Sequence, residues 1–340
     1  MEKIDFIVTW VDGNDPVWQK EKSKWEGTDG KVSDAADGNT ECRYRENGLL
    51  KYWFRAVEKF APWVNTVHFV TCGQRPEWLN EAHPKLHLVN HEDYIPKEYL
   101  PTFNSNTIEL NFHRIEELSE HFVLFNDDVF LLRPIDPTLF FRQGNPKLVS
   151  KLQYHKSVGY NNWSRLLFND YCIVNNSFNI SNSIWQNRKK WFSIKELGYK
   201  KARKNVLCYL ANKTLPVSTY GHVALPHLKS TLQELWERYP EIMHQASMHK
   251  FRADDQVNQY LLCAWNQAKG QFYPTLAENQ GMQMELCPLS FPTISRTVIN
   301  QTTPQICVND SPLNTESEKC LQELARSFDY ILPNKSSYEK

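Results

Sequence analysis

Apolar runs alternate with amphipathic stretches through the first 130 residues of the chain. Four short runs rich in β-branched and aromatic residues predict strands: Ile4–Trp10, Val67–Cys72, Leu86–Val89 and His121–Phe125. Between them, Arg45–Phe60 and Asn104–Ser119 have apolar residues at helical spacing. Strands that alternate with helices predict an α/β fold with a mostly parallel, Rossmann-like sheet flanked by helices.

Two other segments of the first half lack such periodicity. Val11–Pro16 is a polar turn that contains Gly and Pro. Lys20–Thr40 is charged and irregular, and we expect it to be a loop over the carboxyl edge of the sheet.

The pattern weakens in the second half of the chain. The pattern over residues from about 150 to 215 predicts no particular fold. This segment contains a basic cluster at Arg188, Lys189, Lys190, Lys200, Lys201, Arg203 and Lys204. Such a cluster is either a solvated helix face or a contact with anionic lipid or a polyanionic glycan. Beyond it, helices are predicted at Leu228–Tyr239, Asp255–Gln267 and Ser317–Phe328.

Composition narrows the classes of protein. The 340 residues include 39 Lys and Arg and 39 Asp and Glu, so the formal net charge is zero. Because nucleic-acid binding usually needs a basic surface, a nucleic acid is not expected as the main partner. No apolar run reaches the length of a membrane span, and the charged start of the chain does not resemble a signal peptide. None of the eight cysteines forms a CxxC pair. We therefore expect a cytoplasmic protein with free thiols, with at most peripheral contact with the inner face of the membrane.

Two adjacent carboxylates stand at the end of the predicted fourth strand, in Asn126-Asp127-Asp128. Ligands of open α/β sheets bind at the carboxyl ends of the strands. Paired carboxylates there repel each other unless a cation lies between them, and their oxygens suit Mg²⁺ or Mn²⁺ on a phosphate. The alternative is that Asp127 and Asp128 only form a turn.

Polar residues at two other strand or helix ends are further candidates. Asp12 and Gly13 follow the first strand, where a tight turn lets backbone N–H groups approach a nucleotide; the alternative is an ordinary turn. Asn104 and Asn106 open a helix whose N-terminus is able to bind an anion, although Asn is also a common helix cap.

The second half contributes imidazoles and cations. His222, His227 and Lys229 lie in a segment with Pro226, read as a loop before a helix, where a histidine could accept a proton. Arg252 could bind a phosphate in bidentate fashion, or lie on the surface next to a helix cap. Asn309 and Asp310 have no meaning by themselves.

These residues fall in segments that resemble the four signature regions of the Stealth family. Ile4–Pro16 resembles the first region and Arg43–Phe130 the second. His227–Asn258 resembles the third, and Ile306–Asp310 the fourth. The resemblance covers nearly the whole chain, in order, and favours the compact bacterial branch of the family.

The resemblance implies an enzyme that moves a sugar-1-phosphate from a nucleotide-diphospho-sugar to a hydroxyl of a polysaccharide or lipid-linked glycan. It implies a GT-A-like sheet in residues 1–145 that binds the donor, a variable region in 146–215, and a helical part in 216–340 that completes the same site. Asp127 and Asp128 would hold the metal, and His227, or second His222, would act as the base. The remaining site residues, with roles in charge neutralisation and substrate binding, would be Arg252, Asp12, Gly13, Arg43, Asn104, Asn106, Asn126, Lys229, Asn309 and Asp310.

Three other functions are compatible with parts of this pattern. A metal-dependent glycosyltransferase would use the same acidic motif but break the bond between C1 and oxygen. A metal-dependent phosphoesterase would transfer to water. A glycan-binding assembly protein would need the abundant Trp and Tyr residues but no clustered Asp, His and Arg.

Overall fold

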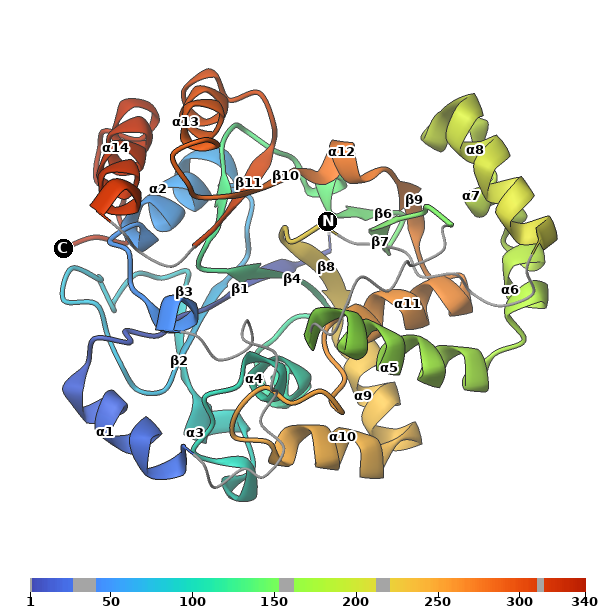
Figure 1. The fold of residues 1–340 in the computed structure, drawn as a ribbon, viewed down its shortest axis with the longest axis horizontal. Helices are drawn as coiled ribbons and strands as arrows, with labels where there is room; N and C mark the ends of the chain where they lie inside the picture. Colours follow the sequence, from blue (N-terminus) through green and yellow to red (C-terminus); the bar gives the residue numbers. More distant parts are fainter. Residues whose placement is uncertain (1, 27–40, 153–161, 212–220, 311–314) are drawn as a thin grey trace.

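A five-stranded sheet lies at the centre of the computed structural model, which describes residues 2–26, 41–152, 162–211, 221–310 and 315–340 (Figure 1). Its order is β3-β2-β1-β4-β8, and its strands are β1 (Ile4–Thr9), β2 (Val67–Thr71), β3 (Leu86–Asn90), β4 (His121–Asn126) and β8 (Leu225–Leu228). The first four are parallel, and β8 is antiparallel to β4. The predicted mostly parallel α/β sheet is therefore confirmed.

Helices cover both faces of this sheet. Phe6 and Val8 of β1 enter one hydrophobic core, with α2 (Leu50–Phe60), α13 (Phe291–Asn300) and α14 (Thr315–Ile331). Ile7, which points to the other face, enters a second core with α4 (Ser105–Leu110), α9 (Lys229–Arg238), α10 (Pro240–Met248) and α11 (Tyr260–Lys269). Figure 1 shows the two helix layers above and below the sheet. Burial on both faces explains why the strands read as continuous apolar runs.

Two smaller sheets extend the molecule. The first has the order β10-β11-β5, from β10 (Met282–Glu285), β11 (Gln305–Asn309) and β5 (Val129–Leu131). The second consists of β6 (Phe141–Arg142), β7 (Asn145–Val149) and β9 (Tyr273–Thr275). Since only Asp127 and Asp128 separate β4 from β5, and β5 pairs with β11, the acidic turn lies next to residues near the end of the chain.

The sequence predicted no fold for the middle segment, and its described residues 162–211 are helical. It forms α5 (Asn162–Ser177), α6 (Ile180–Gln186), α7 (Arg188–Trp191) and α8 (Ile194–Ala211). The buried Asn205 of α8 donates to the carbonyl oxygens of Ser150 (2.8 Å) and Trp191 (2.7 Å) and accepts from the Leu152 N–H. These bonds hold α8 against the end of β7.

Several element bounds differ from the prediction. Part of the predicted loop Lys20–Thr40 is helical, because α1 (Pro16–Trp25) begins with the Asp15 side chain as its cap and Pro16 in its first turn; residues 27–40 lie outside the described ranges. The helix predicted from Arg45 begins at Leu50, after Gly48 with φ of +69°. The helix predicted to reach Ser119 ends at Leu110, where the Asn111 side chain donates to the Thr107 carbonyl.

The second half shows one change of element type. Pro226 and His227 are in strand β8, so the predicted loop before a helix is wrong at this point. Pro226 is tolerated there because β8 is an edge strand. The three predicted helices are present with shifted ends, as α9, α11 and α14. The structure also has two short helices, α3 (His91–Tyr94) and α12 (Ala277–Gln280).

Candidate functional site

A cavity of about 170 Å³ lies at the carboxyl ends of the central strands. Trp10 and Val11 line it from the end of β1, Cys72 from β2, Asn126 from β4 and Asp310 from the end of β11. This is the position at which open α/β sheets bind ligands.

The two adjacent carboxylates form a turn at one wall of this cavity. Burial and the negative charge of Asp128 raise the pKa of Asp127 to about 8. The Oδ1 atom of Asp128 is buried and has no hydrogen-bond partner within the described ranges, while its Oδ2 accepts from the Cys307 thiol at 3.4 Å. A cation would reduce the repulsion between Asp127 and Asp128 and would give the Asp128 Oδ1 atom a partner. The residues present therefore fit a divalent metal ion.

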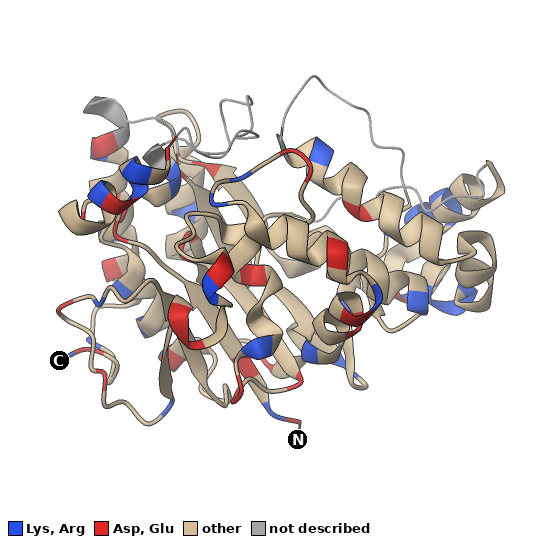
Figure 2. Ribbon diagram, turned by 90° about the horizontal axis from the view of Figure 1, so that it is seen from below, with Lys and Arg blue, Asp and Glu red and all other residues tan. Residues whose placement is uncertain are grey.

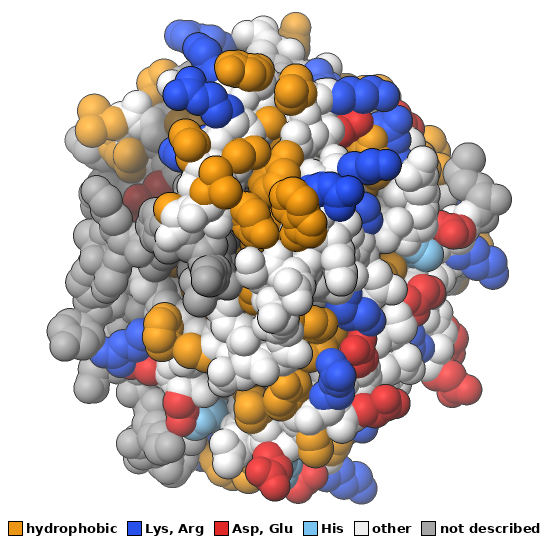
Figure 3. All heavy atoms as spheres, turned by 90° about the vertical axis from the view of Figure 1, so that its right-hand side faces the viewer, with side chains coloured by type: hydrophobic (Ala, Val, Ile, Leu, Met, Phe, Trp, Pro, Cys, Tyr) orange, Lys and Arg blue, Asp and Glu red, His pale blue; other side chains and the backbone are white. Residues whose placement is uncertain are grey.

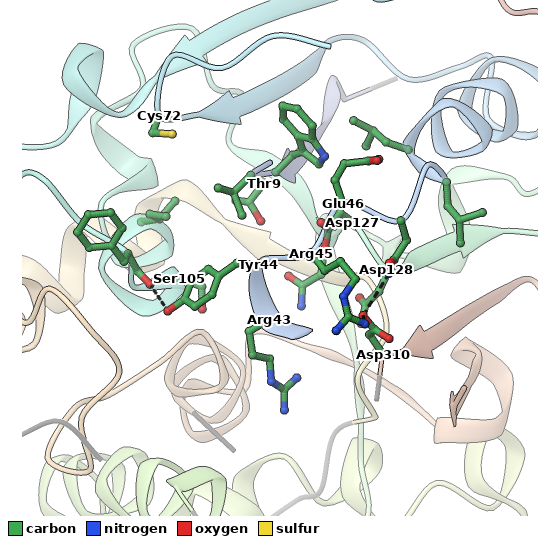
Figure 4. A pocket seen from close by; sticks show the side chains of 18 of the residues that line it. Thr9, Arg43, Tyr44, Arg45, Glu46, Cys72, Ser105, Asp127, Asp128 and Asp310 are labelled. Atoms are coloured by element: carbon green, nitrogen blue, oxygen red, sulfur yellow. Dashed lines mark hydrogen bonds and ion pairs between the residues drawn. The ribbon is translucent and has the colours of Figure 1, made fainter. Parts of the chain in front are cut away.

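Two further carboxylates, those of Glu46 and Asp310, line the cavity (Figure 4). Arg45 donates to Asp310 over 2.8 Å, and Asn47 approaches the same oxygen at 3.4 Å. Glu46 also lines the cavity, and burial raises the pKa of its carboxyl group. Figure 4 shows Asp128 and Asp310 close to the Arg45 guanidinium, while Arg43 extends separately into the foreground.

His222 connects the ends of β4 and β11. Its Nδ1 lies 3.0 Å from Oδ1 of Asn309, and its Nε2 contacts the side-chain nitrogen of Asn126. With Nδ1 protonated and bonded to Asn309, Nε2 keeps its lone pair. Donor atoms of His222, Asp128 and Cys307 lie within 4.8 Å of one another. This arrangement suits either a proton acceptor or a third ligand to an ion on Asp128.

Cations line the same cavity. Arg252 donates to the Ser105 hydroxyl at 2.8 Å, and both residues, with Arg43, line the cavity. Glu109 of α4 is buried behind them, and burial raises its pKa to about 7, while the positive charge of Arg252 acts in the other direction. Guanidinium groups and carboxylates in one cavity suit a metal-bound diphosphate.

In the turn after β1, Asp12 and Gly13 bond to neighbouring backbone, and the predicted approach of this turn to a nucleotide stays a prediction. The Gly13 N–H donates to the carbonyl of Tyr44 at 2.8 Å, and a Cβ at Gly13 would lie 2.2 Å from that oxygen. Glycine is therefore needed for close contact with the 3-10 turn η1 (Glu41–Tyr44). Asp12 caps its own turn by accepting from the Asn14 N–H at 2.9 Å. Neither Asp12 nor Gly13 lines the cavity.

The two asparagines at the start of α4 also have structural surroundings. Asn104 is fully buried, caps α4 through the Asn106 N–H, and donates to Phe251 O (2.9 Å) and to Gln256 Oε1 (3.0 Å). Asn106 is buried beside it and approaches Gln256 at 3.4 Å. The helix-cap alternative is confirmed for Asn104, and it is Ser105 between them that lines the cavity.

His227 and Lys229 lie apart from the cavity lining. His227 is 1% exposed, its Nε2 lies 3.3 Å from Gln259, and burial lowers its pKa to about 4. The Lys229 ammonium donates to the carbonyl oxygens of Ile115 (2.8 Å), Glu116 (3.2 Å) and Leu118 (3.2 Å). The predicted catalytic role of His227 and binding role of Lys229 stay predictions that the geometry does not favour.

Sequence reasoning missed several residues that line the cavity: Trp18, Tyr44, Arg45, Glu46 and Asn47. Four of them form a polar run, which begins at the predicted site residue Arg43 and ends just before α2. The apolar spacing predicts a helix from Arg45 and so hides part of this run, although its position before an amphipathic helix is a usable signal. Cys307, buried beside Asp128, gave no sequence signal of its own.

Comparison with known proteins gives consistent matches. Family models of Stealth protein conserved region 1 and conserved region 2 match residues 2–30 and 43–148. A capsular polysaccharide phosphotransferase WcwK of Streptococcus pneumoniae is 40% identical over the full length of both chains. A receptor polysaccharide phosphotransferase WefC of Streptococcus gordonii is 38% identical over 100% of this chain and 99% of its own.

Solved structures are more distant. A bifunctional glycosyltransferase WbbM covers 97% of this chain and 52% of its own, with 9% identity and a TM-score of 0.39. Mouse xyloside xylosyltransferase 1 covers 91% of this chain and 97% of its own, with 12% identity and a TM-score of 0.33. At these scores the likeness carries no argument about the site.

Proposed function

This chain belongs to the Stealth family of capsular polysaccharide phosphotransferases, and from that premise and the geometry of the cavity we propose that it transfers a sugar-1-phosphate. The donor would be a nucleotide-diphospho-sugar, with an N-acetylhexosamine as the sugar. The acceptor would be a hydroxyl of a capsular or cell-surface polysaccharide. The products are a phosphodiester and a nucleoside monophosphate.

The observation that carries the proposal is the division of charge in one cavity. Asp127 and Asp128 stand at one wall, and Arg43 and Arg252 line the same space. A diphosphate with a divalent ion presents the matching pattern, since its ion needs carboxylates and its remaining oxygens need guanidinium groups.

Asp127 and Asp128 are the residues that would hold Mg²⁺ or Mn²⁺. When bound, the ion would neutralise charge on the diphosphate and stabilise the leaving phosphate. The buried thiol of Cys307 and the imidazole of His222 lie next to Asp128. Nitrogen and sulfur donors favour Mn²⁺ over Mg²⁺ if either of them joins the ion.

His222 is the residue that we assign as the base in place of His227. It lines the cavity, and its Nδ1 lies 3.0 Å from Oδ1 of Asn309. Its Nε2 accepts from the Asn126 side-chain amide, and it would exchange that contact for the acceptor hydroxyl to receive the proton. The acceptor hydroxyl loses that proton as its oxygen bonds to the phosphorus that bears the sugar. The bond from that phosphorus to the nucleoside phosphate breaks, and the C1–O bond stays intact, so the anomeric configuration is retained.

Cations of the cavity would hold the donor rather than react with it. Arg252 is fixed by Ser105 and Arg43 lies at the wall, so both could contact donor oxygens during the displacement. Arg45 is already paired with Asp310, and its part would be to keep the carboxylate wall in place.

Product analysis tests the proposal. Purified protein is incubated with Mn²⁺, UDP-N-acetylglucosamine or related UDP, GDP and CMP sugars, and a capsular glycan, with Asp128→Asn as the matched inactive variant. We expect nucleoside monophosphate and a phosphodiester signal in ³¹P NMR, both dependent on the glycan.

Other products would identify one of the other functions. Nucleoside diphosphate would indicate a glycosyltransferase, and release without glycan would indicate a phosphoesterase. Binding of the glycan without turnover of any donor would indicate an assembly protein. Each of these three results would refute sugar-1-phosphate transfer.

A further inference from the structure

The helices α6–α8 carry a concentration of positive charge in a chain that is neutral as a whole. Residues 180–211 contain one acidic residue, Glu196, against eight basic ones: Arg188, Lys189, Lys190, Lys195, Lys200, Lys201, Arg203 and Lys204. The segment therefore carries a formal charge of +7 while the chain carries zero. Figure 2 shows this end of the molecule with several blue segments and little red.

Two of these cations are held against other elements of the fold, and the Arg188 guanidinium donates to the Trp185 carbonyl at 3.1 Å within the segment. The Lys190 ammonium donates to the Gly270 carbonyl, and Lys201 forms an ion pair with Glu278. The other six are exposed: Arg188, Lys189, Lys195, Lys200, Arg203 and Lys204. They are available to an outside partner.

Large apolar side chains are exposed among these cations. The exposed fractions are 55% for Trp185, 61% for Ile194, 63% for Tyr199, 55% for Leu207 and 73% for Leu210. Figure 3, which faces the side of the molecule where α6–α8 lie in Figure 1, shows apolar side chains gathered with blue ones around them. We call the six exposed cations and these five apolar residues the α6–α8 face.

The spacing along α8 explains why charge and apolar surface share one side. Lys200, Arg203, Lys204, Leu207 and Leu210 recur at intervals of three or four residues and are all exposed. The residues between them, Ala202, Asn205 and Cys208, are buried. Single exposed apolar residues are normal on a solvated surface, whereas several of them gathered on one face indicate an interaction site.

Contacts between helices join α6 to this side of α8. The Trp185 ring stacks on Tyr209 with 6.2 Å between centroids, and the Arg188 guanidinium lies 5.2 Å from the Trp185 ring. Trp, Leu and Ile amid Lys and Arg are the composition of helices that lie in the plane of a bilayer interface. In the described part of the chain, no helix has the length and hydropathy needed to cross a bilayer.

We propose that the α6–α8 face is a membrane-attachment surface that binds a bilayer rich in anionic lipid. Its cations would contact the phosphate headgroups, and Trp185, Leu207 and Leu210 would enter the boundary with the acyl chains. The inference goes beyond the transfer reaction, because attachment needs neither donor nor acceptor.

Vesicle co-sedimentation without substrates tests the basic half of the face. The full-length protein is mixed at low salt with vesicles of phosphatidylglycerol and phosphatidylcholine, or of phosphatidylcholine alone. We expect binding to the anionic vesicles only, and loss of binding at high salt. Lys200→Gln/Arg203→Gln/Lys204→Gln should bind about a hundredfold more weakly, since each cation near the surface contributes about fivefold.

A matched variant controls for net charge. Lys97→Gln/Arg133→Gln/Arg296→Gln removes three exposed cations outside the face and should bind as the wild type does. The proposal would be overturned by absent binding, by equal binding to neutral vesicles, or by equal weakening in both triple variants.

Variants in the apolar half of the face distinguish binding to a membrane from binding to a soluble polyanion. Leu207→Ser/Leu210→Ser should weaken vesicle binding and leave retention on heparin unchanged, whereas Leu289→Ser/Tyr330→Ser, which alters residues 93% and 72% exposed elsewhere, should change neither. Binding to heparin without binding to vesicles would assign the face to a polyanion and refute attachment. Thermal midpoints show that each variant is folded, and a transfer assay, run separately, shows whether the reaction itself fails.

Discussion

Two clusters of polar side chains lie close to each other in this fold and differ in how their hydrogen bonds are satisfied. In the acidic cluster after β4, Asp128 Oδ1 has no partner in the described part of the chain, and Asp127 has a pKa raised to about 8. In the amide cluster behind α4, Asn104 donates to Phe251 and Gln256 and caps α4. One cluster is left incomplete beside a cavity, and the other is complete and buried.

The difference shows which polar residues are available for chemistry. A buried polar group costs stability unless it is bonded, so a carboxylate oxygen without a partner has a cost that a bound ligand would offset. Asn104 has no such cost and no exposed atom. Substitutions in the acidic cluster should therefore lower turnover, and substitutions in the amide cluster should lower stability.

Asp128→Asn should have the largest effect. Turnover should fall by about a thousandfold or more, because an amide cannot replace a charged ligand to the ion. Mn²⁺ titration by calorimetry should show weakened binding, and circular dichroism should show an unchanged fold. Full turnover in this variant, or in the wild type with EDTA, would remove the metal from the proposal.

His222→Ala should lower turnover by about 10²–10⁴-fold, the usual contribution of a positioned base. His227→Ala, the matched variant on the buried strand β8, should keep turnover and lower the free energy of unfolding by about 1–3 kcal/mol. Steady-state kinetics measures the turnover of both variants, and chemical denaturation measures their free energies of unfolding. If His222→Ala loses Mn²⁺ binding as well, His222 is a metal ligand; if His227→Ala alone loses turnover, the base assignment is reversed.

The fold could be predicted from the sequence where one local pattern decides it. Strands β1 and β4 are buried on both faces, and their apolar runs gave their type and ends within one residue. Asp127, Asp128 and Arg252, which line the cavity, could be selected from the sequence because they follow predicted elements or belong to family signatures.

Other positions could not be predicted because distant contacts decide them. Asn104 and Asn126 are both asparagines at the end of an element. They differ only in the folded chain, where Asn104 bonds to Gln256 and Asn126 lines the cavity. His227 lies in a strand because β8 pairs with β4, where its partner Phe122 is 105 residues earlier. Arg45 and Asp310, 265 apart in the sequence, meet only in the folded chain.

The pH dependence of stability should also distinguish the clusters. Asp127 has a folded pKa of about 8 against an ordinary value of 3.8, so between these values the folded state holds a proton that the unfolded state has lost. The free energy of unfolding of metal-free protein should therefore fall as pH rises from about 4 to 8, by at most about 1.4 kcal/mol per unit. Denaturation in EDTA at several pH values measures this slope. Asp127→Asn should flatten it, and an unchanged slope would show that Asp127 does not hold the proton.

The smallest effect should come from the complete cluster. Asn104→Ala removes donors to Phe251 and Gln256 and leaves those buried oxygens with fewer partners, which should cost about 1–3 kcal/mol of unfolding free energy. Asn106→Ala removes one longer contact of 3.4 Å and should cost less. Turnover per folded molecule should stay near the wild-type value in both, because neither side chain lines the cavity. A loss of donor affinity in Asn104→Ala at unchanged stability would instead make Asn104 a binding residue, as the sequence first predicted, and would erase the contrast between the two clusters.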